Sequence, residues 1–420
     1  MKIIKIKLTL ISLLLLCSIV LNLVGCTVSV KAEDLMEGIT PNKIQGLESL
    51  DEYNPNVLDF AIRLFKSSNQ ADENTLISPL SVMSALAMTV NGADAETRAQ
   101  MENALGMSAD ELNLYVYTYM NSLASGEKYK LSMANSIWFA DSEHFVANQN
   151  FLQINADYYG AGIFKTGFDD QTLKDINLWV KQATDGMIED VLDRIPTEAV
   201  MYLVNALAFE AEWSEIYKKE DVKGGIFSKE DGSVQNVEMM HSTEGVYLED
   251  DNATGFIKYY KDQKYAFVAL LPNEGVALSE YVASLNSEAL YALLNGAQSI
   301  TVKTAIPKFE SEFDTEMSET LKSMGMTDAF DENKADFTRL GSSSLGNIFI
   351  NRVIHKTYMS VGEKGTRAGA ATTVEMANKF AAPDATDVKQ VYLDRPFVYM
   401  LIDCENNVPF FIGTLTEVDD

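Results

Sequence analysis

Basic residues, cysteine and histidine are all scarce in this chain of 420 residues. Lysine and arginine number 33 against 61 acidic residues, which gives a formal net charge of −28. DNA, RNA and anionic lipid surfaces are bound through basic groups, so we expect no nucleic-acid partner for a body this acidic. The three histidines have neither metal-ligand nor zinc-protease spacing, and we expect no metal and no cofactor.

The usual local signatures of catalysis are also absent. The sequence has no Gly-x-Ser-x-Gly elbow, no P-loop and no Gly-x-Gly-x-x-Gly turn. The acidic run Glu249-Asp250-Asp251-Asn252 lacks the remaining ligands of a calcium loop, and a solvated turn explains it better. With 47% hydrophobic and 10% aromatic residues the chain can build a large core. These features favour a binding or interaction protein over an enzyme.

The N-terminus has the pattern of a secretory signal. Three lysines precede an apolar run from Leu8 to Val20, and Leu23-Val24-Gly25-Cys26 resembles the lipobox of bacterial lipoproteins, in which the cysteine is lipidated and becomes the first residue. We therefore expect a signal peptide at residues 1–25, a lipidated tether at residues 26–46, and an outward-facing location on the bacterial cell membrane. An uncleaved membrane anchor fits less well, because the run is short for a full span. Only Cys404 would then remain free, so no intramolecular disulfide could form.

Beyond residue 46 the sequence becomes periodic and predicts one large domain over residues 47–420. Apolar spacing predicts a helix from Val57 to Phe65, a second that begins at Ser78-Pro79, and a third after the capping box Ser108-x-x-Glu111. Helices first and strands later favour an α+β domain with large, mainly antiparallel sheets. The strand-like runs are residues 132–140, 200–209, 234–240, 245–248, 265–271, 300–309, 348–361, 391–393, 397–403 and 409–415, with an amphipathic helix through Met317, Leu321 and Met324.

Residues 362–390 interrupt this pattern, because they separate two strong strands without any periodicity of large apolar residues. Connections of this length are usually functional or disordered. The stretch from Gly365 to Glu375 alternates like a strand, yet it buries too little apolar surface to nucleate one, and on its own a flexible linker explains it better. One face of such a strand would be small and uncharged, with Thr366, Ala368, Ala370, Thr372 and Val374.

The beginning of this segment, Glu363-Lys364-Gly365-Thr366 followed by Ala368-Gly369-Ala370-Ala371-Thr372, resembles the hinge of the serpins, the serine protease inhibitors. The resemblance implies a serpin fold with about nine helices, three β-sheets and an exposed reactive-centre loop at about residues 362–391. Further motifs in the family's order occur at residues 74–81, 203–206, 209–213, 237–240, 306–309, 353–356, 394–397 and 409–413.

The resemblance also implies a mechanism and a partner. An extracellular serine protease attacks the loop as a substrate and forms a covalent acyl-enzyme; the cut loop then enters the central sheet as an extra strand and deforms the protease, while the inhibitor itself is a monomer. The inward-facing set is small and uncharged, so its burial would neither overpack the sheet nor leave an ion unpaired. The implied hinge residues are Glu363, Gly365, Thr366, Ala368, Ala370 and Thr372.

Five more positions match residues with gating roles in the family. Ser78, Ser81, Asn205 and His355 resemble the polar cluster beneath the central sheet, whose hydrogen bonds rearrange when the strands part. Trp213 resembles the tryptophan near the point where insertion begins. Ordinary capping or core packing is the alternative for each residue, and both roles can hold together.

The cleaved bond is less well specified. The family's usual spacing of sixteen residues from Glu363 reaches Lys379, so Lys379-Phe380 is the first choice, and a lysine implies a trypsin-like target with an acidic specificity pocket. Cleavage after Met376, Ala377 or Ala381 would instead indicate elastase-like or subtilisin-like targets. The chain between Lys379 and Pro396 is longer than is common in the family, which keeps these alternatives open.

Two further functions stay open beside inhibition. A non-inhibitory serpin would be cleaved in its loop without trapping the protease. A surface lipoprotein that binds solutes or mediates adhesion would explain Cys26 but not the hinge.

Overall fold

The computed structural model describes residues 29–70, 73–123, 128–140, 145–188, 190–195, 200–343, 346–366 and 388–418. The chain divides into two compact units, Met1–Lys31 and Ala32–Asp420, and the fold below is that of the second. Within the described part of the chain, no helix is both long and apolar enough to cross a membrane.

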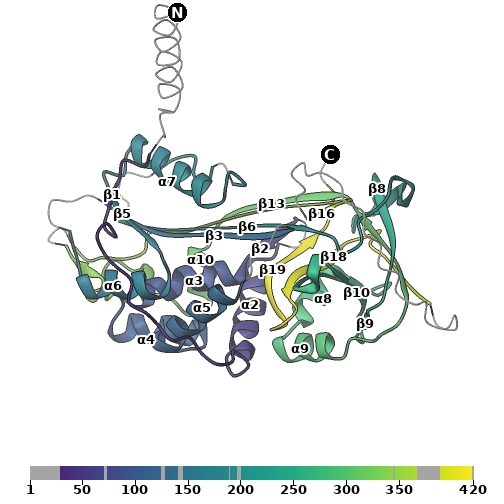
Figure 1. Cartoon of the computed structure of the whole chain (residues 1–420), viewed down its shortest axis with the longest axis horizontal. Helices are drawn as coiled ribbons and strands as arrows, with labels where there is room; N and C mark the ends of the chain where they lie inside the picture. Colours follow the sequence, from purple (N-terminus) through teal and green to yellow (C-terminus); the bar gives the residue numbers. More distant parts are fainter. Residues whose placement is uncertain are drawn as a thin grey trace, which may run out of the picture. The chain divides into compact units, whose positions relative to one another are not determined.

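The largest sheet has seven strands and carries the site described below (Figure 1). Its spatial order is β1 (Glu33–Asp34), β5 (Gly162–Thr166), β3 (Tyr129–Ala140), β6 (Met201–Glu212), β16 (Gly365–Thr366), β15 (Arg352–Gly362) and β13 (Phe309–Glu316). The sheet is mixed. Strand β6 runs antiparallel to β3 and parallel to β15, while β15 and β13 are antiparallel.

Helices cover both faces of this sheet. Figure 1 shows α3, α4, α5 and α6 on one side and α7 on the other. All residues of α3 are buried, because this helix lies between the large sheet and the rest of the domain. The nine α-helices of the described residues are α2 (Asn54–Ser68), α3 (Pro79–Val90), α4 (Ala95–Leu105), α5 (Ala109–Ser122), α6 (Gln149–Tyr158), α7 (Asp170–Ala183), α8 (Leu278–Ser284), α9 (Ser287–Asn295) and α10 (Ser318–Ser323).

Two of the helix starts predicted from the sequence are confirmed. The Ser78 hydroxyl accepts a hydrogen bond from the backbone N–H of Ser81, 3.3 Å away, and Pro79 occupies the first turn of α3. At α5 the capping box forms in both directions between Ser108 and Glu111. Each cap satisfies backbone N–H groups that have no partner inside the helix.

The remaining strands form a six-stranded sheet, a four-stranded sheet and a small two-stranded sheet. The six-stranded sheet consists of β2 (Thr75–Ile77), β19 (Val408–Leu415), β18 (Phe397–Asp403), β11 (Tyr265–Pro272), β10 (Ala253–Tyr259) and β9 (Tyr247–Glu249). The other two consist of β17 (Lys389–Tyr392), β12 (Val302–Pro307), β8 (Val234–Glu244) and β7 (Val222–Ser228), and of β14 (Gly341–Ser342) and β4 (Val146–Ala147). Three short 3₁₀ helices are η1 (Lys219–Asp221), η2 (Lys261–Gln263) and η3 (Asp328–Phe330).

The predicted α+β class, with nine helices and three large sheets, is confirmed for the described residues. One expected strand was wrong in extent. The run 300–309 is two strands in two different sheets, β12 and β13, separated at Lys308. Because one chain segment passes from the four-stranded to the seven-stranded sheet here, Lys308 lies where the two sheets meet.

The segment expected as a tether, residues 26–46, lies along the domain from residue 32 onward. Strand β1 pairs with β5 at the edge of the large sheet, and the Leu35 N–H donates to the Ile163 carbonyl at 2.8 Å. Asn42 then bonds to both carboxylate oxygens of Asp157. We call residues 32–47 the N-terminal strap.

Candidate functional site

The hinge segment begins as a two-residue strand inside the large sheet. In β16, Gly365 pairs with Glu212 and Thr366 pairs with Ala211 of β6, and the other edge of β16 pairs with β15. Gly365 has φ +156°, and a side chain there would overlap the carbonyl oxygen of Ala211. Only glycine therefore allows the chain to turn back so closely against β6.

Beyond β16 the neighbouring strands close on each other. β6 and β15 pair directly in parallel, from Tyr202 with Arg352 to Ala208 with Tyr358. β16 thus lies between β6 and β15 at one end of the two strands, and along the rest of their shared length β6 and β15 pair directly with each other. Any further residues of the hinge could enter the sheet only by separating β6 from β15.

Thr366 is fully buried at the end of this short strand. Its hydroxyl shares a hydrogen bond with the Tyr260 hydroxyl. The Tyr260 ring in turn stacks on the Trp213 ring, with centroids 4.3 Å apart and an interplanar angle of 9°. A small polar side chain fits this position, whereas a long or charged one would displace buried aromatic rings.

Three consecutive carbonyls of the turn between β15 and β16 are bound by two aromatic residues. Trp213 donates its indole N–H to the Gly362 carbonyl at 2.9 Å and its backbone N–H to the Lys364 carbonyl at 2.8 Å. The Tyr217 backbone N–H donates to the Glu363 carbonyl at 2.9 Å. We call the segment Gly362–Gly365 the hinge turn.

The Glu363 side chain fixes the hinge turn from the other side. Its carboxylate lies 2.5 Å from the Lys308 ammonium group, which also contacts Glu238 at 2.7 Å. Burial alone would raise the pKa of Glu363, but the hydrogen bond from Lys308, a backbone hydrogen bond and the nearby lysine charges together outweigh it and lower the pKa below the usual value. Glu363 is therefore ionised at neutral pH.

The four polar residues singled out beneath the sheet lie together around the β6–β15 pair. His355 lies opposite Asn205 in the strand register, and its Nδ1 is 2.7 Å from the Asn205 Oδ1. The Ser78 backbone N–H donates to His355 Nε2 at 3.0 Å. The Asn205 amide donates to the Ser81 carbonyl and, at 2.7 Å, to the Asn135 Oδ1. We call Ser78, Ser81, Asn135, Asn205 and His355 the sheet-core cluster.

These hydrogen bonds assign the protonation state of His355. Its Nε2 accepts from Ser78, so in the neutral ring Nδ1 carries the proton and donates to Asn205. Burial lowers the pKa of His355 to about 3. The ring is therefore neutral at physiological pH, and the cluster connects β6 and β15 across the line that an entering strand would have to open.

The sequence did not indicate every residue of this site. Asn135 lies in a strand-like apolar run of β3, and a single amide in that run was the only sequence sign of a role in the cluster. In the structure it donates to the Ser84 hydroxyl at 2.8 Å. Tyr260 and Lys308 carried no signal for a role at the hinge, because their contacts join segments far apart in sequence. Of the residues expected at the site, Ala368, Ala370, Thr372, Met376, Ala377, Lys379, Phe380, Ala381 and Cys26 lie outside the described residues.

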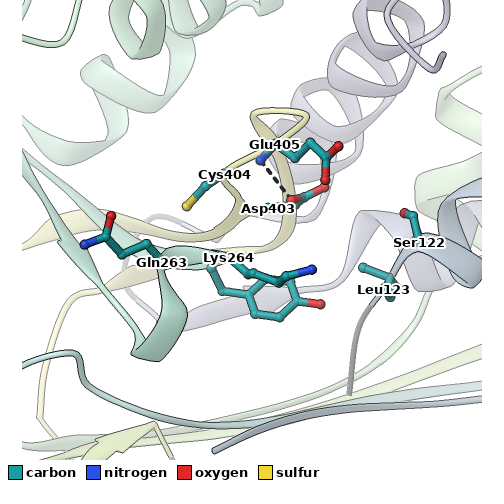
Figure 2. A pocket seen from close by; sticks show the side chains of 8 residues that line it. Ser122, Leu123, Gln263, Lys264, Asp403, Cys404 and Glu405 are labelled. Carbon is teal, nitrogen blue, oxygen red and sulfur yellow. Dashed lines mark hydrogen bonds between the residues drawn. The ribbon is translucent and has the colours of Figure 1, made fainter. Parts of the chain in front are cut away.

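A cavity of about 240 Å³ lies between the end of α5, the start of β11 and the turn after β18 (Figure 2). Burial raises the pKa of its Cys404 thiol to about 12, so the thiol is not a nucleophile at neutral pH. Across the described part of the chain, no group of three or more His, Cys, Asp or Glu residues could hold a metal ion. The residues that line the cavity are Ser122, Leu123, Gln263, Lys264, Tyr265, Asp403, Cys404 and Glu405.

Comparisons with known proteins agree with this architecture. The family model described as Serpin (serine protease inhibitor) matches residues 55–418. An uncharacterized serpin-like protein of Thermococcus kodakarensis is 28% identical, over 86% of this chain and 84% of the relative, and Serpin B8 of Homo sapiens is 29% identical, over 84% and 96%.

Solved structures give the same result at higher identity. The structure of the thermophilic serpin tengpin in the native state has a TM-score of 0.88 and 48% identity, and covers 93% of this chain and 100% of its own. Tengpin in the latent state has a TM-score of 0.78 and 45% identity, covering 90% and 100%. Since the family match spans most of the chain, this protein belongs to the serpin family.

Proposed function

We propose that this serpin is a covalent, loop-insertion inhibitor of trypsin-like serine proteases. The observation that carries the proposal is the position of β16. Two hinge residues already pair with β6 and β15, and beyond them the same two strands pair with each other. The hinge is therefore aligned with the line along which a longer strand would enter. The higher TM-score with native-state than with latent-state tengpin supports a starting state in which the loop has not entered further.

The covalent step follows from the chemistry of the target. The protease serine attacks the carbonyl carbon of Lys379, the bond from that carbon to the Phe380 nitrogen breaks, and the leaving amine takes the proton from the catalytic histidine. The product is an ester between the protease and Lys379. Entry of the residues after Thr366 between β6 and β15 would then move the ester, and the protease with it, along the sheet before water can hydrolyse the bond.

The proposal places this reaction outside a bacterial cell, with the inhibitor held at the membrane through lipidated Cys26 as a monomer. Signal-like residues before Cys26 support this location. Expression of the whole chain in a bacterium, followed by fractionation, tests it. Wild type should sediment with membranes and take up labelled fatty acid, whereas Cys26→Ser should do neither. A wild-type protein that is found free in the cytoplasm would contradict the location without affecting the inhibitory mechanism.

Incubation with trypsin, pancreatic elastase and subtilisin, followed by denaturing gels, tests inhibition. The mature chain carrying Cys26→Ser provides a soluble sample. A covalent band near the summed masses with trypsin supports the proposal. Mass spectrometry of the released C-terminal fragment should then show that its first residue is Phe380. A stable band with elastase or subtilisin and a fragment that begins elsewhere would move the bait to Met376, Ala377 or Ala381. Loop cleavage with full protease activity would indicate a non-inhibitory serpin.

The variant Thr366→Arg tests insertion of the loop separately from recognition and cleavage of the loop by the protease. An arginine at this buried position would place an unpaired charge beside Tyr260 and oppose the entry of the strand. Cleavage after the bait residue should continue, while the covalent band should fall at least tenfold. Thr366→Ser keeps the hydroxyl and serves as the matched control. An undiminished covalent band with Thr366→Arg would exclude insertion through this line.

A further inference from the structure

A buried lysine lies behind the hinge turn. Lys258 of β10 has a side chain that is 2% exposed, and its ammonium group is 2.8 Å from a carboxylate oxygen of Glu244 on β8. The same ammonium group lies 4.6 Å from the centroid of the Tyr217 ring and 5.4 Å from that of the Trp213 ring. Both distances are within the range of a cation–π interaction, which is stronger when the charge is removed from water.

The Glu244 carboxylate is itself held in place. The Ser242 hydroxyl donates to the same carboxylate at 2.6 Å and lies 2.9 Å from the Thr304 hydroxyl of β12. Burial would lower the pKa of Lys258, but the neighbouring Tyr217 and Glu244 more than offset it, and the pKa is raised above the usual value. Lys258 therefore keeps its charge at neutral pH, and the pair joins the six-stranded sheet to the four-stranded sheet.

The two rings that flank this charge are the two residues that bind the hinge turn. Trp213 and Tyr217 supply all three N–H groups that reach the carbonyls of Gly362, Glu363 and Lys364. Trp213 also stacks on Tyr260, the partner of Thr366. A change in the angle of either ring would alter the hydrogen bonds on which the register of β16 depends.

We infer that Lys258 is a positioning residue for loop insertion, which holds Trp213 and Tyr217 so that the hinge turn presents β16 in register between β6 and β15. The inference rests on the loop-insertion function proposed above. Lys258 touches neither the loop nor the protease; it acts through the two rings. Its charge matters because an uncharged side chain of the same length would fill the volume without attracting both ring faces.

The test replaces the charge and keeps the volume. Lys258→Met removes the ammonium group but leaves the partly buried Glu244 carboxylate without its cation, which can destabilise the fold. The double variant Lys258→Met/Glu244→Gln removes both charges and keeps the site neutral. Lys303→Met, which removes an exposed lysine from the neighbouring strand β12, is the matched control. Thermal melting of each variant identifies any general loss of stability.

Two readouts report on the hinge. The first is amide hydrogen exchange in peptides covering residues 360–366, compared with peptides from α3. The second is the stoichiometry of inhibition, the number of inhibitor molecules consumed per protease trapped. In the double variant we expect hinge exchange to become at least tenfold faster while α3 is unchanged, and the stoichiometry to rise at least twofold. Lys303→Met should match wild type in both.

Hinge exchange and stoichiometry that remain at wild-type values in the double variant would overturn the inference. Equal acceleration of exchange in α3 and at the hinge would overturn it as well, because the effect would then be general destabilisation. If wild type traps no protease, the proposed function fails, and hydrogen exchange alone still decides whether Lys258 positions the hinge turn.

Discussion

The protonation of one buried residue, His355, makes the stability of the fold depend on pH. The neutral ring accepts from Ser78 and donates to Asn205, and a second proton would remove the acceptor that Ser78 requires. Its folded-state pKa of about 3 lies below the usual value of 6.5. Between these values the unfolded chain binds the proton and the folded chain does not. The stabilising contribution is therefore complete above pH 6.5 and declines as the pH falls toward 3.

We expect His355→Gln to abolish this pH dependence. The free energy of unfolding of wild type should fall relative to that of the variant by about 1.4 kcal/mol per pH unit between pH 6 and 4. Urea unfolding at pH 7, 6, 5 and 4 measures the difference. Carboxylates titrate in the same range, but they are common to both proteins and cancel. A wild-type advantage that stays constant with pH would show that His355 is not held neutral.

The residues of the sheet-core cluster differ in how far the sequence could indicate them. Ser78 has a local signature, because a serine before Pro79 predicts a helix cap. Asn205 and His355 stood out only by resemblance to family motifs. Asn135 and Lys258 could not be assigned, since each acts through strand pairs or ring contacts that join distant segments. Such roles arise from tertiary pairing and leave no pattern along the chain.

Several strands were not predicted from the sequence, among them β5, β7 and β10, and β13 and β1 show two physical reasons for this. In β13, Phe309, Ser311 and Phe313 are buried, and acidic residues alternate with them on the outer face. The period of two was present, but Asp and Glu have low strand propensity and obscured it. Strand β1 has two exposed residues and no apolar pattern. It forms because β5 offers an unpaired edge, which a local pattern cannot reveal.

The N-terminal strap should contribute measurably to the stability of the large sheet. It covers the edge of β5, and its Leu35 and Ile39 side chains pack against the core. A chain that begins at Lys43 should therefore melt about 2–3 °C lower than one that begins at Ala32, which corresponds to about 2 kcal/mol in a domain of this size. It should also aggregate faster on heating, because an exposed edge strand pairs with other chains.

Calorimetric scans of the two chains at equal concentration measure this difference. The chain that begins at Ala32 keeps every strap contact and is the control for removal of the preceding residues. Two identical melting curves would mean that β1 and the residues after it lie on the sheet without stabilising it.

At the scale of the whole molecule, the fold combines a large acidic body with a sheet that is incompletely filled. The net charge of −28 makes copies of the chain repel one another in solution, which is compatible with the monomer proposed above. Two hinge residues lie in the large sheet as β16. Beyond them β6 and β15 form seven residue pairs, and a longer inserted strand could lie between those pairs if they separated. The intact chain would then not be in the most stable arrangement that its sequence allows.

Cleavage of the loop should consequently stabilise the protein. A cut between residues 367 and 387 would free the hinge from its downstream attachment to β17, so the segment after Thr366, whose inward-facing side chains are small and uncharged, could enter between β6 and β15. The inserted strand would form backbone hydrogen bonds with β6 on one edge and with β15 on the other, in place of the single parallel pairing between β6 and β15. If the net gain is about 5 kcal/mol, the melting temperature of a domain this large should rise by about 6 °C. Circular dichroism before and after limited proteolysis measures the rise. Thr366→Arg, cut at the same bond, should gain little, and a cleaved wild type that melts no higher than the intact chain would rule out insertion as the basis of inhibition.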